Sequence, residues 1–519
     1  MTNVSKKIDV DINYQKIIKD LLKRYIPNTE VWAYGSRVKW TSKPQSDLDM
    51  VVFASKEEKI AASNLKEAFE ESSLPFRVDL FIWDEVPEQF HDNIKKEHVV
   101  LQSVEAEKNI PSEWTEYRLG EFSPFIYGKG LPERDRDKKG KVPVYGSNGV
   151  VGRHTKAYVD NSGIIIGRKG TIGSINLSKE PFYPIDTSFY IEDEPQKRNL
   201  LYTYYLLKTV PLKINNDSAV PGLNRDYAHS IKIKIPPLPE QKAIAEILGA
   251  LDDKIELNRK MNKTLEDMAQ AVFKSWFMDF DLVKAKADGR TIKGLSQEIL
   301  DLFPDSFVES ELGDIPLGWK VEKIEELATI VRGGSPRPIH DFLCDDGLPW
   351  LKISDATSSS TKFINKIDQC IKKEGLNKTR FIKAGSLILS NSATPGIPKF
   401  LSIDSCIHDG WLYFSDYKNI TKELLYYYLL FNREKIVSYG SGSVFTNLKT
   451  DILKNYKIIV PNYLLMDKIN YLFKDFNILI EQNNLKIQTL STIRDSLLPK
   501  LISGEIRVGE AEKILEGVV

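Results

Sequence analysis

The stretch IKIKIPPLPEQKAIAEILGALDDKIELNRKMNKTLEDMAQAVFKSWF, from Ile231 to Phe277, decides how this chain is built, because the chain contains it twice. The second copy, YKIIVPNYLLMDKINYLFKDFNILIEQNNLKIQTLSTIRDSLLPKLI, runs from Tyr456 to Ile502 and aligns with the first without gaps. Further upstream, PSEWTEYRLGEFSPFIYGKG from Pro111 matches PLGWKVEKIEELATIVRGGS from Pro316. Self-similarity of this kind indicates a duplicated structural unit.

The apolar residues of each copy recur at alternating spacings of three and four. This seam contains Leu248, Leu251, Ile255 and Asn258 in the first copy and Phe473, Phe476, Ile480 and Asn483 in the second. The spacing predicts one long helix per copy and is typical of a coiled coil, extending on the order of 50 Å. Asn258 facing Asn483 or its neighbours would form a polar layer that fixes the register. The alternative, two amphipathic helices packed on separate domains, is disfavoured because both copies keep the same spacing.

The part of each copy that precedes the helix contains short apolar runs separated by Gly and Pro, which predict strands and turns. Gly167, Gly170 and Gly173 form a GxxGxxG pattern, but no GK[ST] follows, so turn formation explains these glycines better than phosphate binding does. Basic residues gather in the predicted loops and are candidates for contacts to DNA phosphates or base edges: Arg134, Arg136, Lys138, Lys139, Arg168, Lys169, Arg332 and Arg337. Ordinary basic surface loops have the same composition.

The bulk composition removes several classes of protein. The chain has 519 residues with 72 basic and 72 acidic side chains, so a strongly basic whole chain is not the argument for nucleic-acid binding. Three cysteines and six histidines form no metal-binding or disulfide pattern, which favours the reducing cytoplasm. No run of about 18 apolar residues is present, so we expect no membrane span.

Two similar domains separated by a rigid helical spacer can read two short DNA sequences at a fixed distance. In this organisation the chain resembles a known family, the specificity (S) subunits of type I restriction–modification systems. The resemblance covers residues 111–507 and rests on three motifs: IPPLPEQKAIAEIL (Ile235–Leu248), KIELN (Lys254–Asn258) and LLPKLISGEI (Leu497–Ile506). The second copy departs from the pattern, because PNYLLMDKI stands where the first copy has PPLPEQKAI.

This resemblance implies two target-recognition domains that read the halves of a bipartite site on double-stranded DNA. It also implies two long helices in an antiparallel coiled coil that docks methyltransferase subunits, two of them by expectation, together with restriction/helicase subunits. The specificity portion would need no cofactor and perform no chemistry. Consistent with this, the sequence contains neither an NPPY-type methylase tetrad nor a helicase phosphate loop.

Residues 1–108 lie outside the repeat and show a different pattern. A helix is predicted from about Asp11 to Tyr25, followed by a strand, Val31–Tyr34, and a Gly-Ser turn that opens a short helix. Further strands are predicted at Asp47–Phe53 and Phe76–Trp83, with a helix at Glu57–Glu71 between them.

The polar residues of this segment fit phosphoryl chemistry. Asp47 and Asp49 are two residues apart on one strand, so both carboxylates face one side, and oxygen ligands of this kind suit Mg²⁺. Asp79 on a neighbouring strand would add a third carboxylate, as metal ligand or as base. The Gly35-Ser36 turn would contact phosphate through backbone amides and a hydroxyl, and Arg37 would add positive charge.

The motif YGSRVKWTSKPQSDLDM (Tyr34–Met50) resembles the minimal nucleotidyltransferases of the DNA polymerase β superfamily, whose members include antitoxins that transfer nucleotides to a toxin. The resemblance implies Gly35 and Ser36 as nucleotide-binding positions, Asp47, Asp49 and Asp79 as catalytic and metal-binding positions, and Mg²⁺ with ATP or another nucleoside triphosphate as cofactors. The segment IKKEHVVL (Ile94–Leu101) resembles the closing helix of the family. One departure is Trp40, where many members have Gly.

The predicted fold class is therefore a multidomain α/β and α+β protein, with a mixed nucleotidyltransferase-like sheet followed by two α+β recognition domains and their helices. We name residues 111–238 the first repeat domain and 313–462 the second repeat domain. The remaining predicted segments are the N-terminal domain (1–108), helices at 239–282 and 463–507, a linker at 283–312 and a tail at 508–519. The predicted function is DNA-sequence specificity. The alternatives are a nucleotidyltransferase that uses the repeat for DNA targeting and an inactive N-terminal docking module.

Overall fold

The computed structural model describes residues 8–516 except 28, 44, 55–57, 103–112, 213–221, 291, 293, 359–360 and 440–446. The chain forms two compact units: residues up to Ala250 together with those from Arg494 onward, and Leu251–Ile493. The predicted boundary between the N-terminal domain and the first repeat domain lies outside the described residues. Within the described residues, no helix combines the length and apolar character that crossing a membrane requires.

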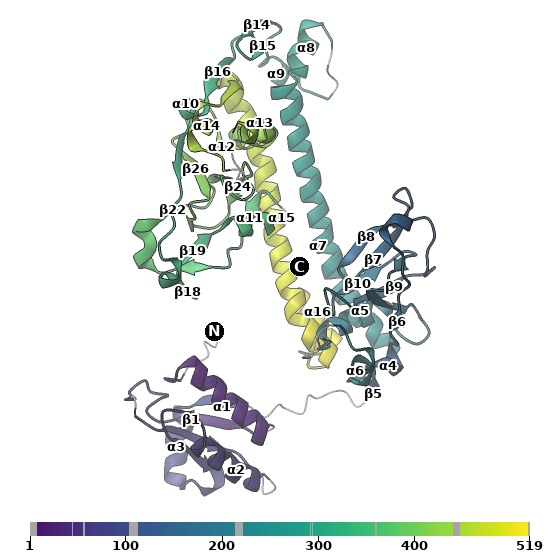
Figure 1. Ribbon diagram of the computed structural model, residues 1–519, viewed down its shortest axis with the longest axis vertical. Helices are drawn as coiled ribbons and strands as arrows, with labels where there is room; N and C mark the ends of the chain where they lie inside the picture. Colours follow the sequence, from purple (N-terminus) through teal and green to yellow (C-terminus); the bar gives the residue numbers. More distant parts are fainter. Residues whose placement is uncertain are drawn as a thin grey trace. The chain divides into compact units, whose positions relative to one another are not determined.

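The N-terminal domain contains a four-stranded mixed sheet with strand order β3-β2-β1-β4 (Figure 1). Its elements are α1 (Ile12–Tyr25), β1 (Val31–Tyr34), β2 (Leu48–Val52), α2 (Lys59–Glu70), β3 (Val78–Ile82), η1 (Trp83–Glu85), α3 (Glu88–Lys96) and β4 (Val99–Gln102). The predicted helices and first three strands are confirmed. Two local predictions are wrong: residues 36–40 form turns instead of a short helix, and only the start of Ile94–Leu101 is helical before β4 begins.

The two faces of this sheet differ in chemistry because side chains alternate along each strand. Val31 and Ala33 of β1, with their apolar neighbours on β2 and β3, pack against α1 and α2 and are buried. The intervening residues, including Tyr34, Asp49 and Asp79, therefore lie on the opposite face. The alternation that buries the core thus collects the predicted catalytic carboxylates on one surface.

The first repeat domain consists of short strands and small helices. Its elements are β5 (Thr115–Arg118), α4 (Leu119–Phe122), β6 (Ile126–Tyr127), η2 (Glu133–Asp135), β7 (Val142–Gly146), β8 (Gly149–His154), β9 (Gly163–Gly167), β10 (Ile175–Ser178), β11 (Tyr183–Pro184), β12 (Ser188–Glu192), α5 (Leu200–Thr209), α6 (Arg225–Ser230) and β13 (Lys232–Ile235). The strands form sheets β10-β9-β12-β6, β11-β7-β8 and β13-β5. Pairing of β5 with β13 brings the two ends of the domain together.

The second repeat domain repeats this plan with larger sheets, β17-β26-β23-β24-β20 and β18-β21-β19-β25-β22. Strand β14 (Phe307–Ser310) precedes this domain and pairs with its first strand, β15. The elements of the domain are β15 (Gly313–Pro316), β16 (Lys320–Lys323), α10 (Ile324–Leu327), β17 (Thr329–Arg332), η4 (Ile339–Asp341), β18 (Leu343–Cys344), β19 (Leu348–Leu351), α11 (Ile353–Ser358), β20 (Phe363–Ile364), β21 (Cys370–Ile371), η5 (Lys373–Lys378), β22 (Arg380–Ile382), β23 (Leu387–Ser390), β24 (Pro398–Leu401), β25 (Ser405–Ile407), β26 (Trp411–Ser415), α12 (Lys422–Phe431), α13 (Arg433–Ser438), α14 (Thr450–Asn455) and β27 (Lys457–Val460). The antiparallel pair β16–β27 is equivalent to β5–β13. The duplication seen in the sequence is therefore also a structural duplication.

Two long helices follow the repeat domains, α7 (Leu238–Phe273) and α15 (Tyr463–Ser503). Their parts in the second unit contact each other: Asn262 accepts a hydrogen bond from Asn483 at 3.0 Å and donates one to Asn484 at 2.8 Å. The rings of Phe273 and Phe473 also lie 6.2 Å apart, so the contacts advance along α7 while they move back along α15. The predicted partner of Asn483 was Asn258, but the observed partner is Asn262, one helical turn further along α7. Asn258 instead donates to the carbonyl of Lys254 on its own helix.

The ends of the two helices contain further elements. After α7, a π-helical turn (Lys274–Met278) leads to Phe280, whose φ of 57° breaks the helix before α8 (Asp281–Ala287). The predicted linker contains α9 (Gln297–Leu300) and the buried Phe303, and the predicted tail contains α16 (Val508–Glu516). Neither segment is a plain connection, because each adds residues to a packed structure.

Each unit encloses a tryptophan at the start of its repeat domain, but in different surroundings. Trp114 donates its indole N–H to Glu240 at 3.0 Å, and Glu240 also pairs with Arg507 at 3.1 Å. At the equivalent place, Trp319 is buried, and its N–H has no partner among the described residues. Leu465 stands where the first copy has Glu240, so the change from PPLPEQKAI to PNYLLMDKI replaces a polar contact by an apolar one.

Replacing Glu240 with alanine should destabilise the first unit by about 1–3 kcal/mol, because the buried indole N–H loses its acceptor and Arg507 loses its partner. Calorimetric unfolding would measure the change. Glu246→Ala, at an exposed position on the same helix, is the matched control and should have little effect. Equal melting temperatures for E240A and E246A would show that this contact does not hold the C-terminal segment in place.

Candidate functional site

Three side chains lie in a row across the N-terminal sheet. In the strand register, Tyr34 of β1 is opposite Asp49 of β2, and Asp49 is opposite Asp79 of β3. Asp47 is exposed and directly precedes β2, two residues before Asp49. The three carboxylates predicted from the sequence therefore lie on or beside neighbouring strands and influence one another electrostatically, and Tyr34, to which no role was predicted, joins them.

The crowding of these groups changes their acidity. The pKa of Asp49 is raised, chiefly by burial and further by the negative charges of Asp79 and Asp47. The pKa of Tyr34 is raised to about 12 by burial, Asp49 and Asp79 together, so its hydroxyl is protonated at neutral pH. A bound divalent cation would reduce the mutual repulsion between these carboxylates.

Gly35 permits the close approach of the phosphate turn to Asp49. Its φ is +80°, and a Cβ added there would lie 2.2 Å from Oδ2 of Asp49. Both the backbone conformation and the available space therefore require glycine. The main-chain N–H groups of Val38 and Lys39 donate to the carbonyl of Gly35, so the segment is a compact turn.

The structure does not support the predicted phosphate contact of Arg37. Arg37 is 5% exposed, and its guanidinium donates to the carbonyls of Ser46 and Asp9 and lies 4.0 Å from the ring centre of Phe76. Because these contacts occupy the guanidinium inside the domain, Arg37 fixes the loop that carries Asp47. Ser36 is half-buried in the turn, as expected for a residue next to the site.

Trp40, the departure from the family pattern, has φ of +57° and a side chain that is 62% exposed. This is the left-handed conformation that glycine adopts most easily, which explains why glycine suits the position. A cavity lies beside Asp49, and Trp40 is not among the residues that line it. Its ring therefore leaves the cavity open.

A cavity of about 430 Å³ adjoins Asp49 and separates the sheet from α3. Its walls combine polar and apolar residues: Tyr34, Gly35, Lys39, Asp49, Phe81, Glu85, Val86, Pro87, Phe90, Asn93, Ile94 and Glu97. Lys39 pairs with Glu97 at 3.5 Å and lines the cavity, whereas Arg37, the predicted phosphate contact, does not. The one signal for Lys39 in the sequence was its place inside the turn motif.

The carboxylate row only partly resembles a formed metal site. Asp79 forms an ion pair with Arg77 at 2.9 Å. Within the described ranges, no three His, Cys, Asp or Glu side chains are close enough together to hold an ion. Asp47 and Asp49 supply the oxygen donors that Mg²⁺ prefers, and the raised pKa of Asp49 indicates that negative charge is concentrated there.

The first repeat domain also contains a cluster of aromatic and basic side chains. Tyr127 at the end of β6 is 46% exposed, and the guanidinium carbons of Arg168 and Arg225 lie 4.9 and 5.0 Å from its ring centre. The carbonyl of Arg168 accepts a hydrogen bond from Leu223. Of the residues predicted to contact DNA, Arg168 is thus part of an organised surface, although Tyr127 and Arg225 were not predicted.

The second repeat domain has an equivalent cluster with different side chains. The carbonyl of Asn391 accepts a hydrogen bond from Leu448, as that of Arg168 does from Leu223, so Asn391 and Arg168 occupy corresponding places. Asn391 Nδ2 and Arg332 Nε both donate to the carbonyl of Asp409, and Arg337 pairs with the Asp409 carboxylate at 3.5 Å. Burial would raise the pKa of Asp409, but the Ser335 hydroxyl and nearby positive charges lower it.

The remaining predicted DNA contacts are scattered. Lys138, Lys139 and Lys169 are exposed loop residues, and Arg134 is an exposed residue of η2. Arg136 is half-buried and donates to the carbonyls of Leu131 and Val151, so it supports its own loop.

Comparison with known proteins identifies both parts of the chain. The family described as "Type I restriction modification DNA specificity domain" matches residues 111–267 and 316–490, and the family "Polymerase beta, Nucleotidyltransferase" matches residues 16–107. The type I restriction enzyme HindI specificity subunit of Haemophilus influenzae is 29% identical over 335 residues, covering 55% of this chain and 71% of the relative. A protein of the same organism, "Probable protein adenylyltransferase MntA", is 41% identical over 105 residues, covering 20% of this chain and 90% of the relative.

Among solved structures, the S subunit of a type I restriction–modification system from M. genitalium has a similar fold, with a TM-score of 0.51 and 17% identity. The match covers 76% of this chain and 97% of that protein. The chain belongs to the type I restriction–modification specificity subunits and carries a fused nucleotidyltransferase domain of the polymerase β type. Both resemblances found in the sequence are confirmed.

Replacing Asp49 with asparagine should stabilise the N-terminal domain at neutral and higher pH. Because the folded protein raises the pKa of Asp49, its charged form destabilises the fold above that pKa, and this penalty disappears as the pH falls below about 4. We expect D49N to raise the melting temperature in EDTA by about 2–4 °C at pH 8, and the gain to shrink towards pH 4. Asp92→Asn, an exposed position on α3, is the control. A lower melting temperature for D49N at pH 8 would contradict the repulsion.

Proposed function

We propose that this specificity subunit reads a bipartite site on double-stranded DNA, one half with each repeat domain. The observation that supports this most directly is the pair of corresponding positions, the half-buried Arg168 and the 4% exposed Asn391, near the exposed Lys169 and Arg332 respectively. Arginine pairs best with guanine and asparagine with adenine in the major groove. If Asn391 turns outward when DNA binds, two copies of one scaffold would read different sequences.

The spacing of the two half-sites would follow from the long helices. We infer that α7 and α15 form an antiparallel coiled coil, supported by the buried Asn262, Asn483 and Asn484 layer and by the opposite directions of the contacts. The 36 residues of α7 correspond to about 54 Å. A coiled coil of that length would set the number of unread base pairs between the half-sites.

The outer face of α15 supports an interaction with a partner subunit. Leu464, Tyr471, Ile478 and Leu485 recur every seven residues and are 62%, 64%, 41% and 63% exposed. In a coiled coil these positions would lie opposite the seam, where charged residues are usual. An exposed apolar stripe with heptad spacing fits an amphipathic helix of a methyltransferase subunit, and restriction subunits would complete the complex.

The DNA-reading proposal can be tested by mapping methylated motifs in cells that express this chain with its methyltransferase partner. Arg168→Ala should relax or change one half-site and Asn391→Ala the other, each through a loss of about 1–3 kcal/mol of base discrimination. Arg118→Ala, an exposed residue of β5 that is not among the predicted DNA contacts, is the control and should leave both half-sites unchanged. If either R168A or N391A altered both half-sites together, the assignment of one half-site per domain would be wrong.

We further propose that the N-terminal domain transfers a nucleotide from ATP to an acceptor hydroxyl. The row of Tyr34, Asp49 and Asp79 beside a cavity of nucleotide size supports this proposal. Asp47 and Asp49 would hold Mg²⁺, which supplies charge neutralisation for the phosphates, and Lys39 would bind the outgoing pyrophosphate. Asp79, released from Arg77, would accept the proton of the attacking hydroxyl.

The second candidate function makes this transfer the primary activity and the repeat domains only its route to DNA. The 41% identity to the adenylyltransferase relative favours keeping this candidate. The third possibility, an inactive docking module, predicts that the carboxylates can be replaced without biochemical effect.

A labelling experiment separates these possibilities. The purified complex should transfer label from α-labelled ATP to one of its components or to an added extract in the presence of Mg²⁺. Asp47→Ala and Gly35→Ala should each reduce transfer at least about 100-fold, because they remove a metal ligand or displace Asp49. Asp84→Ala, an exposed residue outside the cavity lining, is the control. Mg²⁺-independent labelling, or equal labelling by G35A, would exclude this site as the catalytic centre.

A further inference from the structure

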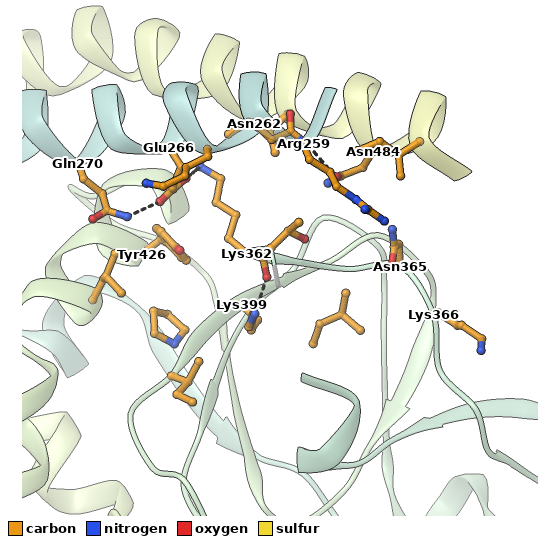
Figure 2. A pocket seen from close by; sticks show the side chains of 18 of the residues that line it. Arg259, Asn262, Glu266, Gln270, Lys362, Asn365, Lys366, Lys399, Tyr426 and Asn484 are labelled. Atoms are coloured by element: carbon orange, nitrogen blue, oxygen red, sulfur yellow. Dashed lines mark hydrogen bonds and ion pairs between the residues drawn. The ribbon is translucent and has the colours of Figure 1, made fainter. Parts of the chain in front are cut away.

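A second and larger cavity, of about 740 Å³, lies in the second unit between α7, α15 and the second repeat domain (Figure 2). Neither the proposed DNA contacts nor the nucleotidyltransferase site uses it. Its size is in the range of small-molecule sites. Its walls come from three separate parts of the chain, so an occupant would contact all three.

Two buried lysines form part of the cavity wall. The side chain of Lys362 is 2% exposed and pairs with Glu266 of α7 at 2.7 Å, and Lys362 also donates to the Tyr427 hydroxyl at 2.9 Å. Lys399 is 8% exposed and donates to the carbonyl of Thr361. Lysine is rarely buried unless an anion accompanies it, and burial lowers the pKa of both ammonium groups.

A buried amide in the same cavity has one donor without a partner. Asn484 of α15 is 8% exposed, and its Oδ1 accepts a hydrogen bond from Asn262. This bond directs Nδ2 away from Asn262, and Nδ2 has no hydrogen-bond partner among the described residues. An unsatisfied buried donor is unfavourable, and because Nδ2 itself is buried, a ligand with acceptor oxygens would satisfy it only after the side chain rotates towards the cavity.

The rim of the cavity is basic. Figure 2 shows Arg259 extending from α7 towards Asn365, and Lys366 follows Asn365 in the loop after β20. The side chains of Arg259 and Lys366 are 61% and 82% exposed. Five of the lining residues are lysine or arginine and three are aspartate or glutamate. Arg259 and Lys366 also pair with Glu256 at 4.0 Å and Asp368 at 3.0 Å, and a phosphate would compete with these exposed carboxylates. Tyr426 and Leu430 supply an apolar surface within the same space.

We propose that this cavity binds an organic phosphate of mononucleotide size, with its phosphate at the rim near Arg259 and Lys366 and its organic part against Tyr426. Such a ligand would contact α7, α15 and the second repeat domain at once. It would therefore stabilise the orientation of that domain on the helices, because binding to the folded state alone raises stability.

The proposal can be tested by isothermal titration calorimetry of the full-length protein with AMP, ribose 5-phosphate, adenosine and inorganic phosphate. AMP or ribose 5-phosphate should bind with a Kd below about 1 mM and raise the melting temperature, while adenosine should bind at least about tenfold more weakly. Ribose 5-phosphate binding as tightly as AMP would assign the site to sugar phosphates in general. Absence of saturable binding by both organic phosphates would overturn the proposal.

Variants at exposed positions separate this cavity from the N-terminal one without disturbing the fold. Arg259→Gln combined with Lys366→Gln should weaken binding at least about tenfold. The matched control, Lys260→Gln with Lys373→Gln, removes equal charge from exposed positions on α7 and the second repeat domain. Gly35→Ala alters only the N-terminal cavity and should leave this binding intact. If G35A abolishes AMP binding while R259Q/K366Q retains it, the ligand binds in the N-terminal domain and the inference is wrong.

Discussion

The buried amide layer between the two long helices is the constraint on which the second unit depends. Asn262 both accepts from Asn483 and donates to Asn484, and these bonds form in only one register. A shift of one turn would break both bonds and leave buried amide groups unpaired, at a cost of about 1–3 kcal/mol for each group. The same register places Glu266 next to Lys362 and Phe273 next to Phe473, so the packing of the second repeat domain on α7 follows from it.

The two copies of the repeat have kept a backbone plan and changed its contents. The strand pairs β5–β13 and β16–β27 and the hydrogen bonds to the carbonyls of Arg168 and Asn391 are shared. The contact around the first tryptophan of each copy is not shared, since Leu465 in the second copy stands in the place of Glu240 in the first. The second copy compensates with an apolar cluster in which Phe277 and Phe280 pack on Trp319. Divergence of this kind allows two domains of one architecture to present different surfaces.

In the N-terminal domain, residues that favour folding and residues that suit a functional site lie on different faces of the sheet. Its core is an ordinary apolar face, while its other face gathers carboxylates whose charges oppose one another. Trp40 adds a left-handed backbone at a position that suits glycine. Unfavourable features that cluster at one place in an otherwise well-packed domain are typical of a functional site.

The sequence alone determined the duplication, the long helices, the mixed N-terminal sheet and the carboxylate motif. These features depend on hydrophobic periodicity and turn residues, which can be recognised within a short stretch of sequence. It did not determine which residues meet across the fold. Asn258 and Asn262 occupy equivalent places in the helical pattern, and the register of the two helices decides that Asn262 forms the buried bonds. Arg37 was predicted to contact phosphate, but in the folded domain it is buried and donates to backbone carbonyls. Cys344 and Cys370 have no pattern in the sequence, yet they are opposite each other in β18 and β21. Contacts between residues far apart in the chain depend on packing and strand register, and these are decided by the tertiary structure.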